Sequence, residues 1–259
     1  HTRFKCDWKF RRVLFRSVIA LIVVMSVMTG FDIALRDTII GNRAHVMVYM
    51  PSNQQMQHYE DVIKEVQQAA PEVLAAGPIV QVEALLRRGD YTTGAFVLGI
   101  DPELETQVTD LGKNLTKTGG RQFGLGELPK DKEIVLGYRL ASRLGVRIGA
   151  EIAVITDKPT VTPFGIRPGN QVYLTVCGIA QAKMSDYDSL YGFVNIATAQ
   201  MLTGRSGVDG VHLKLHDPFM AEAVTKKIEE ALPYRAQTWY ESQEAFFEAL
   251  KQEKVAMFI

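Results

Sequence analysis

The segments HVMVYM (residues 45–50) and IVQVEALL (residues 79–86) decide the fold, because both predict strands that flank one helix. Between them, residues 59–70 place apolar side chains on one helical face. Pro71 follows this helical pattern directly, where a proline ends a helix. The order strand, helix, strand predicts a β-α-β unit.

A second unit of the same kind lies near the end of the chain. Residues 211–215 (VHLKL) alternate as in a strand, residues 218–232 follow a helical period, and residues 235–238 form a short strand pattern. Asp217 is suited to the N-cap, with Pro218 at the first helical position. Two separated units predict a split ferredoxin-like (βαβ…βαβ) layer with an insertion. The alternative is two independent domains, in which each lone unit buries little apolar surface.

The residues between the two units have a different character. A glycine-rich loop covers residues 116–129, and the strands predicted around it are short. They cover residues 93–100, 134–136, 151–156, 171–180 and 191–196, and short helices are predicted over residues 102–111 and 138–144. This pattern predicts a small, strongly bent, β-rich subdomain. We therefore predict an α+β fold, with the ferredoxin-like layer at residues 43–90 plus 207–240 and the inserted β-rich subdomain at residues 91–206.

Two apolar runs flank this predicted domain. VIALIVVMSVMTGF (residues 18–31) carries no charge, but it is shorter than the roughly 20 residues that cross a bilayer. We interpret residues 18–42 as the end of a first transmembrane helix with its extension, and residues 241–259 as a helix leading into a truncated second one. The alternative for residues 18–31 is a buried core helix. The candidate membrane-helix residues are Val18, Ile22, Met25, Met28 and Phe31.

The first 17 residues resemble a signal peptide, because a basic segment precedes an apolar run. Within them, FRRVLFRS (residues 10–17) resembles the translation of a common sequencing adapter. We therefore interpret residues 1–17 as a sequencing-adapter artefact. They carry six Lys or Arg and one Asp, so the rest of this formally neutral chain has a net charge of −5. That charge argues against nucleic acid as a partner.

The sequence lacks the motifs of common enzyme classes and of metal sites. It has no G-x-x-x-x-G-K-[ST], H-E-x-x-H or G-x-S-x-G pattern. The two cysteines, Cys6 and Cys177, cannot form a metal set, and Cys177 lies in an apolar run typical of an inert thiol. We expect His212 and His216 to share one solvated strand face. Asp186 and Asp188 could form a carboxylate pair, but aspartates beside a strand start are typical of a turn. These patterns predict a protein without catalytic residues, metal or cofactor.

One loop has the composition of a docking element. DKPTVTPFGIRPGNQ (residues 157–171) joins two predicted strands, so it forms the end of a hairpin. Its prolines restrict the backbone and lower the entropic cost of binding. Phe164 and Ile166 lie in this loop without an evident core to enter. The alternative is a loop folded back on its own subdomain.

Several stretches resemble the LolC/LolE family, the permease subunits of an ABC-type lipoprotein-releasing complex. They are SVMTGFDIALRDTIIG (residues 26–41), the segments at residues 133–156, 162–168 (TPFGIRP), 187–200 and 211–219, and QEKVAMFI (residues 252–259). The resemblance implies an inner-membrane protein of Gram-negative bacteria, with most of this chain in the periplasm. It also implies a MacB-like periplasmic domain between the first two of four membrane helices.

The same resemblance implies partners. They are an ABC ATPase subunit (LolD-like) that binds ATP, a second permease subunit (LolE-like or a second copy), lipoproteins, and the periplasmic carrier LolA. In LolC-type subunits a protruding hairpin, the hook, binds the carrier. By position, the hook hairpin here is residues 157–171, with the carrier-binding residues Pro163, Phe164, Gly165, Ile166, Arg167 and Pro168. This loop favours a LolC-type or fused LolF-type subunit over LolE.

Two other functions stay open at this point. One is a MacB/FtsX-type ABC permease that exports peptides or other substrates. The other is a single-span extracytoplasmic binding module or enzyme. The complete reading frame distinguishes them, because a fused nucleotide-binding domain favours the first and the lack of further apolar spans favours the second.

Overall fold

The computed structural model describes residues 15–16, 18–19, 22–30, 41–116, 126–157, 160–162, 165–167, 169–182, 184–239 and 241. The chain divides into two compact units, His1–Ile39 and Ile40–Ile259. In the first unit, residues 22–30 are helical, and Thr29 Oγ1 donates to the Met25 carbonyl at 2.8 Å. Among the described residues, no helix is both long enough and apolar enough to cross a bilayer. Phe31 and residues 242–259, part of the predicted membrane segments, lie outside the described residues.

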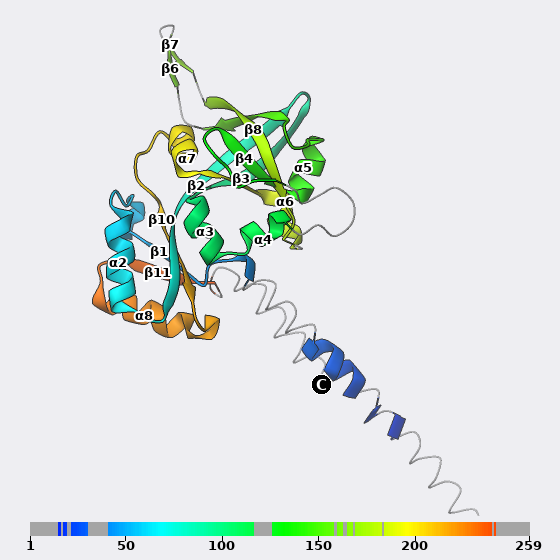
Figure 1. The fold of residues 1–259 in the computed structure, drawn as a ribbon, viewed down its shortest axis with the longest axis vertical. Helices are drawn as coiled ribbons and strands as arrows, with labels where there is room; N and C mark the ends of the chain where they lie inside the picture. Colours follow the sequence, from blue (N-terminus) through cyan, green and yellow to red (C-terminus); the bar gives the residue numbers. More distant parts are fainter. Residues whose placement is uncertain are drawn as a thin grey trace, which may run out of the picture. The chain divides into compact units, whose positions relative to one another are not determined.

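The second unit contains the following strands and helices, most of which are labelled in Figure 1. The strands are β1 (Val46–Tyr49), β2 (Val73–Arg88), β3 (Tyr91–Ile100), β4 (Glu133–Gly137), β5 (Glu151–Thr156), β6 (Thr160–Thr162), β7 (Gly165–Arg167), β8 (Asn170–Ala180), β9 (Tyr191–Asn195), β10 (Gly210–Leu215) and β11 (Arg235–Thr238). The helices are α2 (Tyr59–Ala69), α3 (Pro102–Val108), α4 (Leu111–Thr116), α5 (Tyr138–Leu144), α6 (Ser185–Leu190), α7 (Ile196–Thr203) and α8 (Ala221–Ala231).

In the described part of the chain, nine strands form one sheet in the order β11-β1-β10-β2-β3-β9-β4-β8-β5. The strands β11, β1, β10 and β2 are antiparallel to their neighbours, and α2 and α8 pack on this part of the sheet. We call these four strands the open layer. Strand β5 also pairs with β2, so β2, β3, β9, β4, β8 and β5 close on themselves. We call these six strands the ring.

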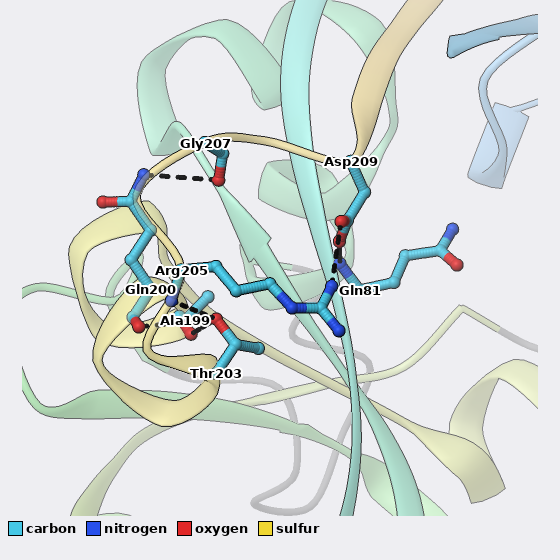
Figure 2. Close-up of polar contacts among 7 residues, drawn as sticks. All are labelled: Gln81, Ala199, Gln200, Thr203, Arg205, Gly207 and Asp209. Carbon is cyan, nitrogen blue, oxygen red and sulfur yellow. Dashed lines mark hydrogen bonds and ion pairs between the residues drawn. The ribbon is translucent and has the colours of Figure 1, made fainter. Parts of the chain in front are cut away.

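Strand β2 belongs to both regions because it changes partner along its length. Residues 73–79 pair with β10, whereas residues 85–87 pair with β5. Between the two pairings, Gln81 N donates to Asp209 Oδ2 at 2.7 Å, and Asp209 N donates to the Ile79 carbonyl at 2.9 Å. Figure 2 shows this junction, where Arg205 Nη1 lies 3.4 Å from Asp209 Oδ1. Asp209 therefore accepts the N–H of Gln81, a β2 residue that pairs with neither β10 nor β5.

The connection from α7 to β10 carries this aspartate and is itself held by side chains. Gln200 Nε2 donates to the carbonyls of Ser206 at 2.8 Å and Gly207 at 3.5 Å. Thr203 Oγ1 donates to the Ala199 carbonyl at 3.0 Å. These bonds hold the short connection in the position from which Asp209 accepts a hydrogen bond from Gln81 N.

The two faces of the ring bury different apolar clusters. On one face, α5 and α7 pack over buried residues that include Val80, Val97 and Leu86. At Gly99, an added Cβ would lie 2.2 Å from the Ala199 Cβ, so α7 approaches β3 closely only because this residue is glycine. On the other face, α4 and α6 contribute to a second cluster. It contains Ile79, Leu98, Ile100, Leu111, Leu115, Val135, Ala180, Ala182, Tyr187 and Phe193.

Several elements differ from the sequence-based expectations. The helix expected over residues 102–111 ends at Val108, and α4 begins at Leu111. Residues around Asp186 and Asp188, where turn chemistry was expected, form helix α6. Asp188 is buried, and its Oδ1 accepts a hydrogen bond from Ala182 N at 2.8 Å. A buried carboxylate here stabilises the backbone before α6, so it has a structural role.

Candidate functional site

The predicted hook corresponds to a hairpin of two short strands. Strands β6 and β7 pair through Thr160↔Arg167, Val161↔Ile166 and Thr162↔Gly165. Within the described residues they have no pairing with the nine-stranded sheet. In Figure 1 the hairpin stands away from the rest of its unit. For the predicted binding residues, the structure places the backbone of Gly165, Ile166 and Arg167 in β7, while Pro163, Phe164 and Pro168 lie outside the described residues.

The base of this hairpin is firmly anchored. Strands β5 and β8 stay in register up to the pair Thr156↔Asn170. Thr156 Oγ1 donates to the Leu202 carbonyl at 3.2 Å, and Asn170 Nδ2 donates to the Met201 carbonyl at 3.5 Å. Helix α7 therefore holds both strands at the point where the hairpin leaves the ring.

An apolar groove lies beside the base of the hairpin. Its volume is about 560 Å³, and its lining includes the apolar side chains of Leu85, Phe96, Ile155 and Leu190. Asp157, the residue directly after β5, also lines the groove, and the β6–β7 hairpin follows it in sequence. Leu85 is 49% exposed and Phe96 41% exposed, so the ring presents apolar side chains to solvent next to the root of the hairpin.

A second pocket shares Phe96 with this groove and is lined by residues 42–44 and by residues of the open layer, β3, β9, α3 and α6, among others. Its volume is about 360 Å³. Arg43 and Trp239 also line it, close in sequence to the ends of the described part of the second unit. Glu105 of α3 and His212 of β10 contribute titratable groups to its wall. We call this cavity the Glu105 pocket.

Glu105 is a buried carboxylate with one unpaired oxygen. The residue is only 3% exposed, and Thr109 Oγ1 donates to its Oε1 at 3.0 Å. Its Oε2 has no hydrogen-bond partner among the described residues. His212 Nδ1 lies 3.8 Å from Oε2, which is too long for a hydrogen bond. The expectation of two solvated histidines was wrong for His212, whose side chain is 15% exposed, because α3 packs against β10.

Aromatic rings form a third part of the pocket wall. The ring centroids of Tyr187 and Tyr191 lie 5.0 Å apart, and those of Phe96 and Tyr191 lie 5.8 Å apart. Burial raises the pKa of Tyr187 above its ordinary value, and the nearby Glu105 carboxylate acts in the same direction. The Tyr187 phenol therefore stays neutral at physiological pH.

Cys177 and the candidate membrane residues lie elsewhere in the structure. Burial raises the pKa of Cys177 to about 12, so the thiol is unreactive near neutral pH, and its Sγ lies 3.6 Å from the Glu127 carbonyl oxygen. Within the described ranges, no three His, Cys, Asp or Glu side chains are grouped as metal ligands. The predicted membrane residues Val18, Ile22, Met25 and Met28 lie in helical segments of the first unit.

Glu105 was missed by the sequence reasoning. It lies three residues before Val108, and both are buried on the same side of α3. A glutamate on the apolar stripe of a helix is therefore the signal that could have revealed it. His212 needed the tertiary structure, because only the packing of α3 removes it from solvent.

Comparisons with known proteins found a matching family and similar relatives. Residues 15–231 match the family described as "MacB-like periplasmic core domain". The lipoprotein-releasing system transmembrane protein LolC of Xylella fastidiosa strain Temecula1 is 31% identical over 245 residues, which are 93% of this chain and 57% of that protein. LolC of Neisseria meningitidis serogroup B is 31% identical over 246 residues, with 93% and 58% covered. The chain thus spans little more than half the length of these relatives.

Among solved structures, the periplasmic region of MacB from Actinobacillus actinomycetemcomitans matches with a TM-score of 0.48 and 12% identity. The match covers 80% of this chain and 94% of that structure. The family match extends over most of both described units and includes the ring, the hairpin and α8. The chain therefore belongs to the family of MacB-like periplasmic core domains, as a member of the LolC/LolE type.

Proposed function

We propose that this chain is part of a LolC-type permease subunit that receives a periplasmic carrier, LolA, through the β6–β7 hairpin. The relatives bear the name of the lipoprotein-releasing system, which makes lipoproteins the proposed cargo. The hairpin is the observation that carries the carrier-binding step. It pairs with no other described strand, and its base is anchored to α7. Such an element can present residues 163–168 to a partner at low entropic cost.

The proposed organisation follows from the strand order. The order β11-β1-β10-β2 interleaves two β-α-β units, which supports a split ferredoxin-like layer at residues 43–90 plus 207–240. Residues 91–206 would then be the inserted β-rich subdomain. We propose that residues 18–42 and 241–259 connect this domain to two helices in the bacterial inner membrane, with the domain itself in the periplasm.

The energy source belongs to another subunit in this proposal. The sequence has no phosphate-binding G-x-x-x-x-G-K-[ST] loop, so we assign ATP hydrolysis to a LolD-like ATPase and give this chain no catalytic role. The second permease would be a LolE-like subunit or another copy of the same chain. Movement of the domain between its two membrane connections would couple hydrolysis to cargo release.

The carrier-binding step is tested with the double variant Phe164→Ala, Arg167→Ala. We expect its affinity for purified LolA to fall at least about tenfold, because an aromatic anchor and an arginine commonly dominate such contacts. Biolayer interferometry with the immobilised chain measures the dissociation constant. The unfolding midpoint is expected to stay unchanged, since the hairpin pairs with no other described strand.

The matched control is Phe219→Ala with Arg235→Ala, which removes an exposed aromatic ring and an exposed guanidinium on the open-layer side. This control is expected to bind LolA as the unchanged chain does. Equal losses in the two double variants, or no LolA binding by the unchanged chain, would contradict the hook assignment.

A MacB-type exporter is the second candidate, because the matching family takes its name from MacB. The two candidates differ in their response to the carrier and in gene organisation. A nucleotide-binding domain in the same reading frame, together with no binding of LolA, would favour the exporter.

A further inference from the structure

The apolar groove beside the hairpin has a floor of paired strands with open space at a glycine. In this floor Leu85 of β2 pairs with Gly94 of β3 on one side and with Ile155 of β5 on the other. An added Cβ at Gly94 would meet no atom within 4 Å, so the missing side chain leaves room above the sheet. Phe96 lies two residues further along β3 and therefore points to the same face as Gly94. We call this cavity the Leu85 groove.

The Leu85 groove keeps large apolar side chains in contact with solvent. Leu190, the last residue of α6, lines it together with Leu85 and Phe96 and is 37% exposed. The volume of about 560 Å³ falls within the range of small-ligand pockets. Exposed apolar side chains that gather around one groove indicate a binding site, whereas scattered ones do not. The groove therefore fits an occupant that covers its apolar side chains.

Polar groups of the floor are engaged within the protein. Thr156 lines the groove, and its Oγ1 donates to the Leu202 carbonyl at 3.2 Å. Ala84 and Ala95 line it as well, and they pair with each other in the ladder between β2 and β3. A peptide on this floor would bring N–H and carbonyl groups that lose water without gaining these groups as partners, which is unfavourable. A saturated hydrocarbon chain needs no such partner.

The charged residues along the groove are acidic. Glu83 and Asp157 are the charged residues in its described lining, and both are exposed. Arg87 follows Leu85 on the same face of β2 but does not line the groove, and its Nη2 donates to Gln171 Oε1 at 3.2 Å. Two carboxylates repel a lipid whose head group is anionic. An acyl chain held by an uncharged ester or amide meets no such repulsion.

We propose that the Leu85 groove holds one fatty acyl chain of a lipoprotein, joined to that protein through an uncharged linkage. This inference rests on the proposed function, which supplies the cargo and the carrier. The acyl chain lies over Gly94 and packs on Leu85 and Phe96, while the two carboxylates disfavour lipids with anionic head groups. Asp157 leads directly from β5 towards the hairpin, so the bound chain lies beside the element that receives the carrier.

The test uses the full 259-residue chain in a nonionic detergent, with N-methylpalmitamide that carries a photoreactive diazirine in its acyl chain as the probe. Mass spectrometry after irradiation maps the labelled residues. We expect labelling of the residues that line the groove, and we expect it to saturate as the probe concentration rises. Leu74 and Phe219 are exposed apolar residues outside the groove, and their labelling should rise in proportion to the probe.

A substitution that fills the open space tests where the acyl chain lies. Gly94→Leu places a side chain there and is expected to lower the groove labelling about tenfold through lost apolar contact. Ala223→Leu adds a leucine at an exposed position of α8 and is expected to leave the labelling unchanged. Urea denaturation shows whether each variant is folded. The double variant Leu85→Ser, Phe96→Ser weakens the same site if Gly94→Leu unfolds the chain.

A matched anionic probe tests the two carboxylates. Palmitic acid with the same diazirine, ionised at mildly alkaline pH, is expected to label the groove several times less than the amide at low ionic strength. Glu83→Gln with Asp157→Asn should reduce this difference. Glu103→Gln with Glu230→Gln changes two exposed carboxylates elsewhere and should preserve it. Equal labelling by the acid and the amide in the unchanged chain would overturn the role of the carboxylates.

The acyl site and the hook assignment fail separately, because the labelling is measured without the carrier. Saturable labelling in a chain that binds no LolA would support the acyl site and contradict only the hook. Labelling that does not saturate, or that is equal in Gly94→Leu and Ala223→Leu, would overturn the acyl site. An unlabelled groove, together with weaker LolA binding by Leu85→Ser, Phe96→Ser, would identify a protein-docking surface and would also overturn it.

Discussion

The open layer and the ring share strand β2, but they protect their strand edges in different ways. The ring has no free edge along the stretch where β5 pairs with β2. The open layer ends at β11, which has β1 as its neighbour on one side. There, Ala236 N donates to Glu229 Oε1 at 3.2 Å and Thr238 N donates to Glu241 Oε2 at 2.8 Å.

The same solution appears where β2 passes from β10 to β5. Asp209 accepts from Gln81 N in the interval without a strand neighbour, as the two glutamates accept from β11. A carboxylate therefore takes the place of a strand carbonyl at each of these positions. It satisfies the N–H group and leaves a charge at the edge, which opposes pairing with another chain.

The largest effect is expected for a substitution in strand β3 of the ring. Gly99→Ala would place a Cβ 2.2 Å from the Ala199 Cβ, so α7 must move away from β3. We expect a loss of about 3 kcal/mol in the free energy of unfolding, at the upper end of overpacking effects. Urea denaturation measures it. Gly94→Ala on the same strand is the control, since an added Cβ there meets no atom within 4 Å. Similar losses in both variants would refute the close packing of α7.

A smaller effect is expected at the junction of the two regions. Asp209→Ala leaves Gln81 N without its acceptor and removes the ion pair with Arg205. We expect a loss of about 1–2 kcal/mol, and about half of that for Asp209→Asn, which keeps a carbonyl oxygen. Urea denaturation gives the loss, and hydrogen exchange at the Gln81 amide shows whether it is local. Unchanged exchange at Gln81 in Asp209→Ala would show that the carboxylate does not hold the junction.

The smallest effect is expected at the free edge of the open layer. Glu241→Gln weakens the bond to Thr238 N, so amide exchange at Thr238 should become several times faster, with a stability loss of about 0.5 kcal/mol. Glu230→Gln changes an exposed glutamate of α8 for which no hydrogen bond to β11 is found in the described structure, and it should leave this exchange rate unchanged. If the Thr238 amide exchanges at the original rate in both variants, Glu241 does not protect this edge.

Elements with a clear local period were predictable. The bounds predicted for the helix Tyr138–Leu144 and for the strands Glu151–Thr156 and Arg235–Thr238 are confirmed. Helix α7 was missed although its signals are present. Asn195 Oδ1 accepts from Thr198 N at 2.9 Å as an N-cap, and Gly204 ends the helix in the left-handed conformation.

The length of β2 was underestimated, because the strand was predicted over residues 79–86, whereas β2 runs from Val73 to Arg88 and passes through Pro78. Ile79 O and Gln81 N both face Asp209 on the β10 side, so the Pro78 nitrogen points to the opposite side of the strand. There the pairing with β3 begins only at Ile79↔Ile100. The proline therefore removes no ladder hydrogen bond, and β2 continues through it. Nothing local in the sequence indicates that Pro78 has no pairing partner in β3.

The sequence alone determined the helical and strand periods, the two β-α-β units and the position of the β6–β7 hairpin, because each is a property of neighbouring residues. The tertiary structure decided the rest. It joined β5 to β2, brought Asp209 to Gln81 across 128 positions, and enclosed Glu105 with His212. These contacts join residues far apart in the chain, and a local pattern carries no information about which distant strand or helix will supply the partner.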